Sequence, residues 1–284
     1  MSLLYLYLLR LVAFPLLIIS MLPLAATAAP EPHVVARAYI LIDGASHRVL
    51  LEKNADERLQ PASLTKMMTA YVVLDALRKG AIQWQQPVRV KASDLAHIGG
   101  DEASMHLRVG EVITVQELFT GLIVVSANDA AMVLARTAGG SIQAFLTAMN
   151  DAARELGLHS SHFATPSGVT TADHYSTARD LALLSVHLTE RFPAYLAFST
   201  QRNFTRGSFS RHNKNRLLAE DPSVDGLKTG HTAKAGYCVA ATAKRNIEGE
   251  GGHQTRRVFA VVLGAPSDEG RFVAGKALID YGFQ

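Results

Sequence analysis

The sequence predicts an α+β domain in which an antiparallel sheet, flanked by helices, is built from both chain ends with a helical region inserted between them. β-Branched and apolar runs lie near the N-terminus, at residues 34–43 and 47–51. Helical periodicity dominates from Ser63 onward, and residues 237–242 and 258–263 alternate like strands. We see no internal repeat and no linker that would mark a second independent domain.

The first two strands are joined by Gly44-Ala45-Ser46, which has the composition of a turn. From Ser63 the apolar residues recur with the spacing of a buried helix, which closes at Gly80. A capping box at residues 114–117 opens a second helical block, which is interrupted near Ser126. The helix is expected to resume over 130–138; further helices are predicted over 141–156, 177–192 and 272–281, and a polar tip at 249–252 joins the last two strands.

The N-terminal segment is typical of a signal peptide. Residues 1–28 hold one charge, Arg10, then an apolar run and the small-x-small site Ala26-Thr27-Ala28. The alternative is a retained membrane anchor, but Pro15 and Pro23 interrupt the run and the small residues favour cleavage. We expect an exported chain, periplasmic or secreted, with residues 29–284 as the mature protein.

Charge and cysteine content narrow the possible functions. Loss of residues 1–28 removes only Arg10, which leaves 27 Lys and Arg against 25 Asp and Glu. This balance gives no argument for a nucleic-acid partner or an anionic membrane surface. Cys238 is the only cysteine, so no intramolecular disulfide is possible, and its apolar neighbours favour a buried thiol.

Ser63 and Lys66 are candidates for a nucleophile and its base. They lie three residues apart at the start of a predicted helix, so the amine can reach the hydroxyl. A helix N-terminus also presents free N–H groups to developing negative charge. Ser-x-x-Lys occurs by chance in many chains, however, and Ser is a common N-cap.

Two further polar segments follow in the chain. Ser126-Ala127-Asn128 lies where the apolar helical run breaks, and its ordinary interpretation is a helix cap. Lys228-Thr229-Gly230-His231 precedes the 237–242 strand. A strand edge with Lys, Thr and a Gly that permits close approach suits an extended peptide ending in a carboxylate. The alternative is an exposed strand with a solvated Lys.

The three segments, in this order, match the Ser-x-x-Lys, Ser-x-Asn and Lys-Thr-Gly set of penicillin-binding proteins and β-lactamases. With these motifs the sequence resembles the low-molecular-mass penicillin-binding proteins, the D-alanyl-D-alanine carboxypeptidase family of serine peptidases. The resemblance extends over residues 34–283 and includes the surroundings of Ser63 and the terminal 277–283 segment. It implies a β-lactamase/DD-peptidase-like fold.

The resemblance also implies roles for these residues. Ser63 would form an acyl-enzyme with peptidoglycan stem peptides ending in D-Ala-D-Ala, and β-lactams would be covalent inhibitors. Lys66, made neutral by burial and by the charge of Lys228, would take the Ser63 proton, and Ser126 would pass it to the leaving amine. Substrate binding is expected from Asn128, Lys228, Thr229, Gly230 and His231, with the oxyanion between the backbone N–H groups of Ser63 and His231. The family needs no metal or organic cofactor.

Two features depart from relatives that are anchored in the membrane. Some family members carry an Arg after the Gly that ends the final strand, but here Gly264 is followed by Ala265-Pro266, and the nearest candidate is Arg271. The sequence also stops at Gln284, without a C-terminal β domain or an amphipathic terminal helix. We therefore expect a single catalytic domain with no stable membrane anchor after signal cleavage.

Three alternatives to the carboxypeptidase interpretation stay open. A DD-endopeptidase would cut D-alanine cross-links with the same residues. A β-lactamase is disfavoured because there is no Glu-x-x-Leu-Asn segment to supply a deacylation base. A non-catalytic wall-binding protein is disfavoured because all the reacting side chains are present.

Overall fold

The computed structural model describes residues 30–96, 98–100, 102–249 and 252–284. Of the two units into which the chain divides, the second, Glu31–Gln284, holds all the helices and strands described here. The predicted signal segment, residues 1–28, lies outside the described residues.

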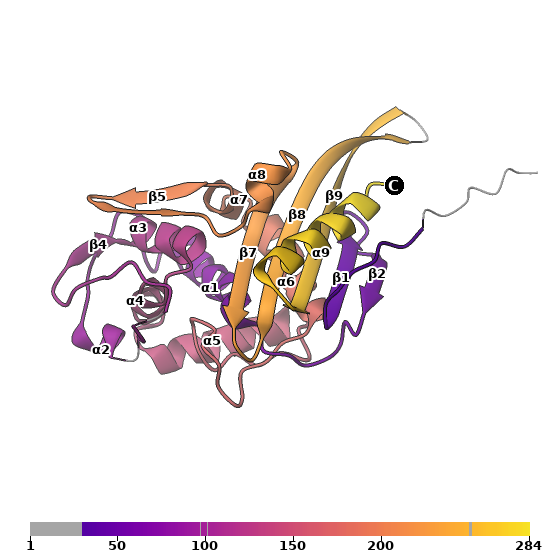
Figure 1. Cartoon of the computed structure of the whole chain (residues 1–284). Coiled ribbons are helices and arrows are strands. Elements are labelled where there is room, and N and C mark those ends of the chain that lie inside the picture. The colour runs from indigo at the N-terminus through magenta and orange to yellow at the C-terminus, as the bar shows by residue number, and fades with distance from the viewer. Residues whose placement is uncertain (1–29, 97, 101, 250–251) are drawn as a thin grey trace, which may run out of the picture. The chain divides into compact units, whose positions relative to one another are not determined.

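A five-stranded antiparallel sheet runs through the second unit in the order β2-β1-β9-β8-β7 (Figure 1). β1 pairs with β9, so the first and last strands of the chain lie side by side as predicted. β7, which carries the Lys-Thr-Gly segment, is an edge strand. The strands are β1 (Ala38–Asp43), β2 (Val49–Lys53), β7 (Val224–Thr232), β8 (Gly236–Gly249) and β9 (Gly252–Ala265).

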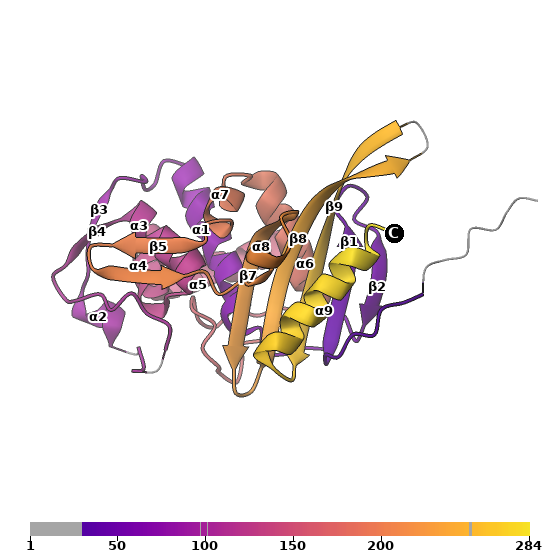
Figure 2. The same cartoon turned by 45° about the horizontal axis from the view of Figure 1, so that its top comes forward.

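Helices pack against both faces of the sheet. Successive residues of a strand point to opposite faces, so neighbouring residues contact different helices. Val261 belongs to the hydrophobic cluster that includes α6 (Ala178–Arg191), whereas Val262 belongs to the cluster that includes α9 (Asp268–Tyr281). Figure 2 shows α9 lying across the front of the sheet with α6 behind it. The sheet is therefore the middle layer between helices, as the sequence predicts.

A helical region is inserted between β2 and β7. It begins with a short 3₁₀ turn that carries Ser63 and continues through the helices that surround the candidate site. Together with α6, these elements are η1 (Ala62–Thr65), α1 (Lys66–Arg78), α2 (Ala92–Leu95), α3 (Val115–Thr120), η2 (Gly121–Val125), α4 (Asn128–Gly139), α5 (Ile142–Glu155), α7 (Tyr195–Ser199) and α8 (Leu217–Glu220). Two small two-stranded sheets accompany them. One pairs β3 (Pro87–Arg89) with β4 (Val112–Thr114), and the other is a hairpin of β5 (Asn203–Arg206) and β6 (Phe209–His212).

The predicted helix starts at Thr114, Ser141 and Thr177 are confirmed. Each side chain accepts a hydrogen bond from a backbone N–H three residues later, which is the expected N-cap geometry. Cys238 is fully buried as predicted, and burial raises the pKa of its thiol to about 11. The two small two-stranded sheets were not predicted, because strands of three or four residues are too short to show a reliable alternation.

Candidate active site

Ser63 lies in the 3₁₀ turn η1, immediately before α1 begins at Lys66. The turn places the two side chains on one side of the chain, and Lys66 Nζ lies 3.0 Å from Ser63 Oγ. Ser63 is half-buried, whereas Lys66 has no exposed surface. The predicted contact between hydroxyl and amine is therefore present.

The Lys66 amine has three oxygen neighbours. It donates to Asn128 Oδ1 and to the Ser167 carbonyl, both at 2.6 Å, in addition to the Ser63 contact. A protonated amine would use all three hydrogens on these oxygens. A neutral amine has two hydrogens for Asn128 and Ser167 and one lone pair, which is left to accept the hydrogen of the Ser63 hydroxyl.

Burial lowers the pKa of Lys66 to about 7, because the charged form loses its hydration. The positive charge of Lys214 lowers it further, while Glu102 and Asp129 act in the opposite direction. From the sequence, we expected this electrostatic effect from Lys228 and did not anticipate Lys214. Burial first, and then repulsion by the charge of the other motif lysine, Lys66, holds the pKa of Lys228 well below its usual range.

Ser126 and Asn128 come from the break between η2 and α4. Five residues of π-helix end at Ser126, which has φ +66°, and α4 begins two residues later. The break turns both polar side chains toward Lys66 and Lys228: Asn128 Oδ1 accepts from Lys66, and Ser126 Oγ accepts from Lys228 Nζ at 2.9 Å. The Asn128 amide also donates to Glu102 Oε2, so its orientation is fixed from both ends.

β7 brings the third segment against the Ser63 turn. Gly230 permits this close approach, because a Cβ at this position would lie 3.0 Å from Ser63 N and 3.1 Å from the Pro61 carbonyl, closer than most Cβ contacts. Lys228 is buried and donates to Ser126 Oγ and to the Thr229 carbonyl, both at 2.9 Å. The exposed His231 ring stacks on Tyr237, with ring centroids 4.0 Å apart.

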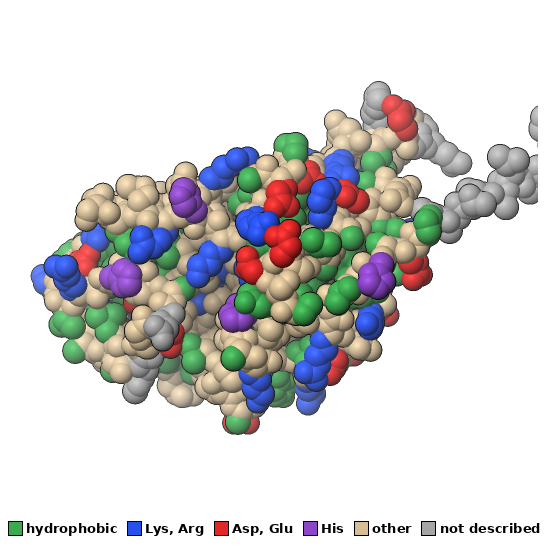
Figure 3. Space-filling model, viewed as in Figure 1, with side chains coloured by type: hydrophobic (Ala, Val, Ile, Leu, Met, Phe, Trp, Pro, Cys, Tyr) green, Lys and Arg blue, Asp and Glu red, His purple; other side chains and the backbone are tan. Residues whose placement is uncertain are grey.

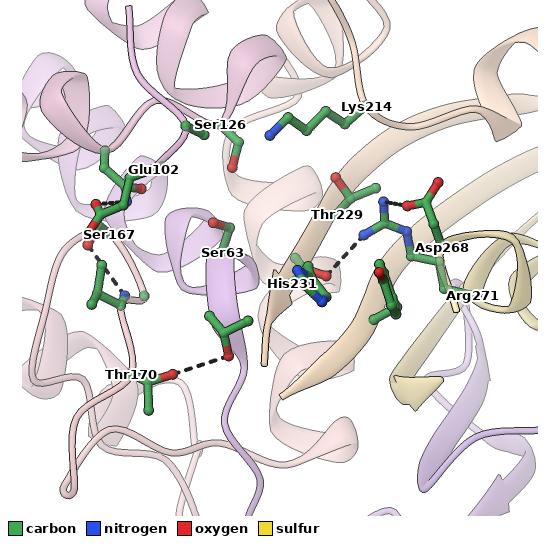
Figure 4. Close-up of a pocket in the computed structure, with 17 residues that line it drawn as sticks. Ser63, Glu102, Ser126, Ser167, Thr170, Lys214, Thr229, His231, Asp268 and Arg271 are labelled. Atoms are coloured by element: carbon green, nitrogen blue, oxygen red, sulfur yellow. Dashed lines mark hydrogen bonds and ion pairs between the residues drawn. The ribbon is translucent and has the colours of Figure 1, made fainter. Parts of the chain in front are cut away.

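These side chains line one pocket of about 550 Å³. Figure 4 shows Ser63 at its centre, with Ser126 above it and Thr229 and His231 on the β7 side. The pocket lining contains the predicted residues Ser63, Ser126, Asn128, Thr229, Gly230 and His231, and Lys66 and Lys228 contact it from beneath through Ser63 and Ser126. The structure therefore brings all eight predicted site residues together.

Sequence reasoning missed three contributors to the pocket. Lys214 follows the β5–β6 hairpin and reaches the pocket wall, and Glu102 reaches it from the segment before α3. Neither belongs to a motif. Ser167 acts through its backbone carbonyl, which no pattern of side chains could reveal.

Arg271, the sequence candidate for anion recognition, lines the same pocket from α9. Arg271 is buried, and its guanidinium pairs with Asp268 and donates to the Gly230 carbonyl at 3.0 Å. Its Nε has no hydrogen-bond partner among the described residues. Arg271 therefore supports the backbone of β7 and adds positive charge beside it.

Charge of both signs is distributed over the face shown in Figure 3. Within the described residues, no group of three or more His, Cys, Asp or Glu side chains is placed to hold a metal ion. The chemistry that this pocket offers is a hydroxyl beside an amine of lowered pKa, with further cations around it.

The sequence matches the family described as D-alanyl-D-alanine carboxypeptidase over residues 25–267. The chain belongs to the D-alanyl-D-alanine carboxypeptidase family. It is 39% identical over 265 residues to the D-alanyl-D-alanine carboxypeptidase DacC of Escherichia coli K12, covering 89% of this chain and 62% of that protein. The chain thus spans somewhat less than two thirds of the length of curated relatives such as this one.

Solved structures of this family share the fold. Penicillin-binding protein 5 from Haemophilus influenzae superposes with a TM-score of 0.84 at 36% identity, over 90% of this chain and 72% of that one. Penicillin-binding protein D2 from Listeria monocytogenes, in a cefotaxime-bound form, superposes with a TM-score of 0.79 at 30% identity, over 90% of this chain and 100% of that one. The fold implied by the sequence resemblance is confirmed.

Proposed function

We propose that this chain is a serine-type DD-carboxypeptidase, which removes the terminal D-alanine from peptidoglycan stem peptides through an acyl-enzyme on Ser63. The observation that carries the proposal is the buried Lys66 amine, 3.0 Å from Ser63 Oγ, with a pKa of about 7. An amine that is partly neutral at pH 7 can act as a general base for a hydroxyl. Membership of the D-alanyl-D-alanine carboxypeptidase family supports the same chemistry.

In the acylation step, Lys66 Nζ takes the proton of the Ser63 hydroxyl while Ser63 Oγ attacks the carbonyl carbon between the two D-alanines. The negative charge that develops on the carbonyl oxygen would be held by the backbone N–H groups of Ser63 and His231. The proton then passes through Ser126 to the amine of the departing D-alanine as the C–N bond breaks. Water attacks the resulting ester, which releases the shortened peptide and restores the Ser63 hydroxyl.

The pocket is suited to a substrate that ends in a carboxylate. Lys214 and Arg271 line it, and Lys228 lies just beneath. Among the described residues, Lys214 has no hydrogen bond or ion pair of its own. We assign carboxylate binding to Thr229 and the neighbouring cations, with His231 beside them and Asn128 fixing the peptide backbone.

Binding of β-lactams is part of this proposal. The penicillin-binding protein D2 of Listeria monocytogenes, which is about 30% identical to this chain, has been solved in cefotaxime-bound and ampicillin-bound forms. A β-lactam presents a strained amide and a carboxylate, so it offers the same pocket the same two groups. We therefore expect β-lactams to acylate Ser63.

We further propose that residues 1–28 are a cleaved signal peptide and that residues 29–284 form the exported catalytic domain. No helix in the described part of the chain is long and apolar enough to cross a membrane. The action of the proposed enzyme on peptidoglycan requires that it leave the cytoplasm, to the periplasm or the exterior. N-terminal sequencing of the secreted protein tests the cleavage point.

Incubation with benzylpenicillin is expected to add the mass of one penicillin to the wild-type chain, and Ser63→Ala should remove this adduct. Intact-mass spectrometry gives both results directly. Because Ser63 is half-buried at the surface of a turn, the loss of its hydroxyl should leave the melting temperature nearly unchanged. A wild-type protein that gains no mass would contradict the acyl-transfer mechanism.

Digestion of purified muropeptides separates the carboxypeptidase from the endopeptidase alternative. Loss of terminal D-alanine from monomers supports the proposal, whereas conversion of cross-linked dimers to monomers would favour an endopeptidase. Rapid turnover of penicillin, in place of a persistent adduct, would favour a β-lactamase.

The rate of acylation should rise with pH, with a midpoint near pH 7. Below that midpoint Lys66 is protonated and cannot accept the Ser63 proton; above it the neutral amine predominates.

Lys214→Gln should move the midpoint to higher pH, because the positive charge of Lys214 lowers the pKa of Lys66 in the wild type. Stopped-flow measurement with a fluorescent penicillin across pH 5 to 9 (a range of roughly two units either side of the midpoint) checks both. A midpoint unchanged or lowered in Lys214→Gln would contradict this assignment.

A further inference from the structure

His174 is a buried histidine that takes no part in the mechanism described above. It lies between α5 and α6 and has no exposed surface. Its Nδ1 accepts a hydrogen bond from the Ala164 backbone N–H at 3.0 Å. Because a backbone N–H can only donate, the ring hydrogen must be on Nε2, which lies 2.6 Å from Thr65 Oγ1 and donates to it. Both ring nitrogens therefore hold defined partners.

These two partners belong to different parts of the site. Thr65 lies between Ser63 and Lys66 in the turn that begins the nucleophile helix. Ala164 opens residues 164–171, the pocket-lining segment, whose Ser167, Gly168, Val169 and Thr170 form one wall of the active-site pocket. The imidazole thus connects the nucleophile turn to the pocket-lining segment through its two hydrogen bonds.

The pocket-lining segment is fixed to the same side of α1 at two further points. Thr69 Oγ1 donates to the Pro166 carbonyl at 2.6 Å, and Lys66 Nζ donates to the Ser167 carbonyl at 2.6 Å. At its far end, Thr170 Oγ1 donates to Thr232 Oγ1 of β7, and Figure 4 shows this bond running below Ser63. A shift of the segment would therefore move the Ser167 carbonyl relative to the Lys66 amine.

The position of the Ser167 carbonyl decides where the Lys66 lone pair points. A neutral amine donates its two hydrogens to Ser167 and Asn128, and only then is the lone pair directed at Ser63. If the carbonyl moved away, the amine could rotate and donate a hydrogen to Ser63 Oγ. In that orientation it could not accept the hydroxyl proton.

We propose that His174 is a positioning residue for the acyl-transfer reaction, which ties Thr65 to the pocket-lining segment and so holds the Ser167 carbonyl where it directs the Lys66 amine at Ser63. This inference rests on the function proposed above and adds a residue outside its three motifs. Burial, followed by the charges of His162 and Lys66, lowers the pKa of His174 to about 4. The ring is therefore neutral over the range in which Lys66 titrates, and both of its hydrogen bonds persist there.

Two variants remove the hydrogen bond between Thr65 and His174, one from each partner. His174→Asn keeps an oxygen near the place of Nδ1, to accept from Ala164, but cannot reach Thr65. Thr65→Val replaces the hydroxyl with a methyl group of similar volume and leaves His174 intact. Thr65→Ser keeps the hydroxyl and serves as the conservative rescue. His162→Asn is the matched control, since His162 lies near the start of the same loop and its ring contacts the Asp173 carbonyl, outside the active-site pocket.

The measurement is stopped-flow acylation of the full chain by a fluorescent penicillin, with the active fraction determined from the burst amplitude. His174→Asn and Thr65→Val should each lower the acylation rate constant about 10- to 100-fold, because a small displacement of a reacting group costs about this much. The dissociation constant of the initial complex should stay the same. The double variant should lose no more than either single variant, since both remove one interaction. Thr65→Ser and His162→Asn should acylate like the wild type.

A purely structural role for His174 would lower the burst amplitude or the melting temperature but not the rate constant of the folded fraction, and that result would overturn the proposal. Wild-type rate constants in Thr65→Val, the variant least prone to misfold, would overturn it as well. Failure of the wild-type chain to acylate would instead refute the proposed function, and this inference with it. The two failures are thus distinguishable in one set of traces.

Discussion

Lys66→Met should lower the rate of acylation by penicillin by about 10³-fold or more, the scale that a general base contributes. The methionine side chain is nearly as long as that of lysine and suits a position with no exposed surface, but it cannot accept the Ser63 proton. The reaction would then depend on water, which this buried side of Ser63 does not admit readily. A fluorescent penicillin, followed by gel or stopped flow, gives the rate.

The fold should survive this substitution. Lys66→Met leaves the Asn128 Oδ1 and the Ser167 carbonyl with one donor fewer each, at a cost of about 1–3 kcal/mol per unsatisfied group. It also removes a buried amine whose desolvation is unfavourable, which offsets part of that cost. Urea unfolding measures the balance and shows whether any loss of rate comes from loss of folded protein.

Lys79→Met is the matched control for Lys66→Met. Lys79 lies at the end of the same helix, where its amine pairs with Asp75 at 2.7 Å and its side chain is 63% exposed. Exposed pairs of this kind contribute about 1 kcal/mol or less, so both stability and acylation should stay close to the wild type. Acylation of Lys66→Met at the rate of Lys79→Met would exclude Lys66 as the base.

The sequence predicts this site well where the chemistry is local. Ser63 and Lys66 share one turn, so their contact follows from a spacing of three. The helix break at Ser126 was visible as polar residues within an apolar run, and the structure places it at a π-helix that ends with φ +66°. The three motifs, taken in order, predicted that the Lys-Thr-Gly segment, which lies on β7, would belong to the same site as Ser63.

Other features depend on distances through space and could not be predicted. Lys214 influences Lys66 because the chain returns to the pocket after the unpredicted β5–β6 hairpin. The electrostatic effect was therefore assigned to Lys228, the only other lysine that a motif placed nearby. The contribution of Ser167 comes from a backbone carbonyl, and that of His174 from a loop without periodicity, so neither left a pattern in the sequence.

The pocket-lining segment and the Ser63 turn also meet at one glycine, and Gly168→Ala is expected to damage both. Gly168 has φ +85°, and a Cβ at this position would lie 2.0 Å from the Ala62 carbonyl oxygen and 2.8 Å from Thr65 Oγ1. Backbone strain of about 1–2 kcal/mol adds to a steric conflict of about 1–3 kcal/mol, which gives a loss of roughly 2–5 kcal/mol in the free energy of unfolding. The conflict can be relieved only by moving the turn or the segment, so acylation of the folded fraction should fall as well.

Gly207→Ala separates the steric conflict from the strain of a positive φ. Gly207 lies between β5 and β6 with φ +56°, and an added Cβ meets no atom within 4 Å. This variant should lose only the backbone contribution of about 1–2 kcal/mol and acylate like the wild type. Urea unfolding compares the stabilities, and the fluorescent penicillin compares the rates. If the two variants lose equal stability and both acylate normally, the close approach of Gly168 to Ala62 does not constrain the nucleophile turn. If Gly168→Ala alone loses more stability and acylates more slowly, this approach helps to set the position of Ser63.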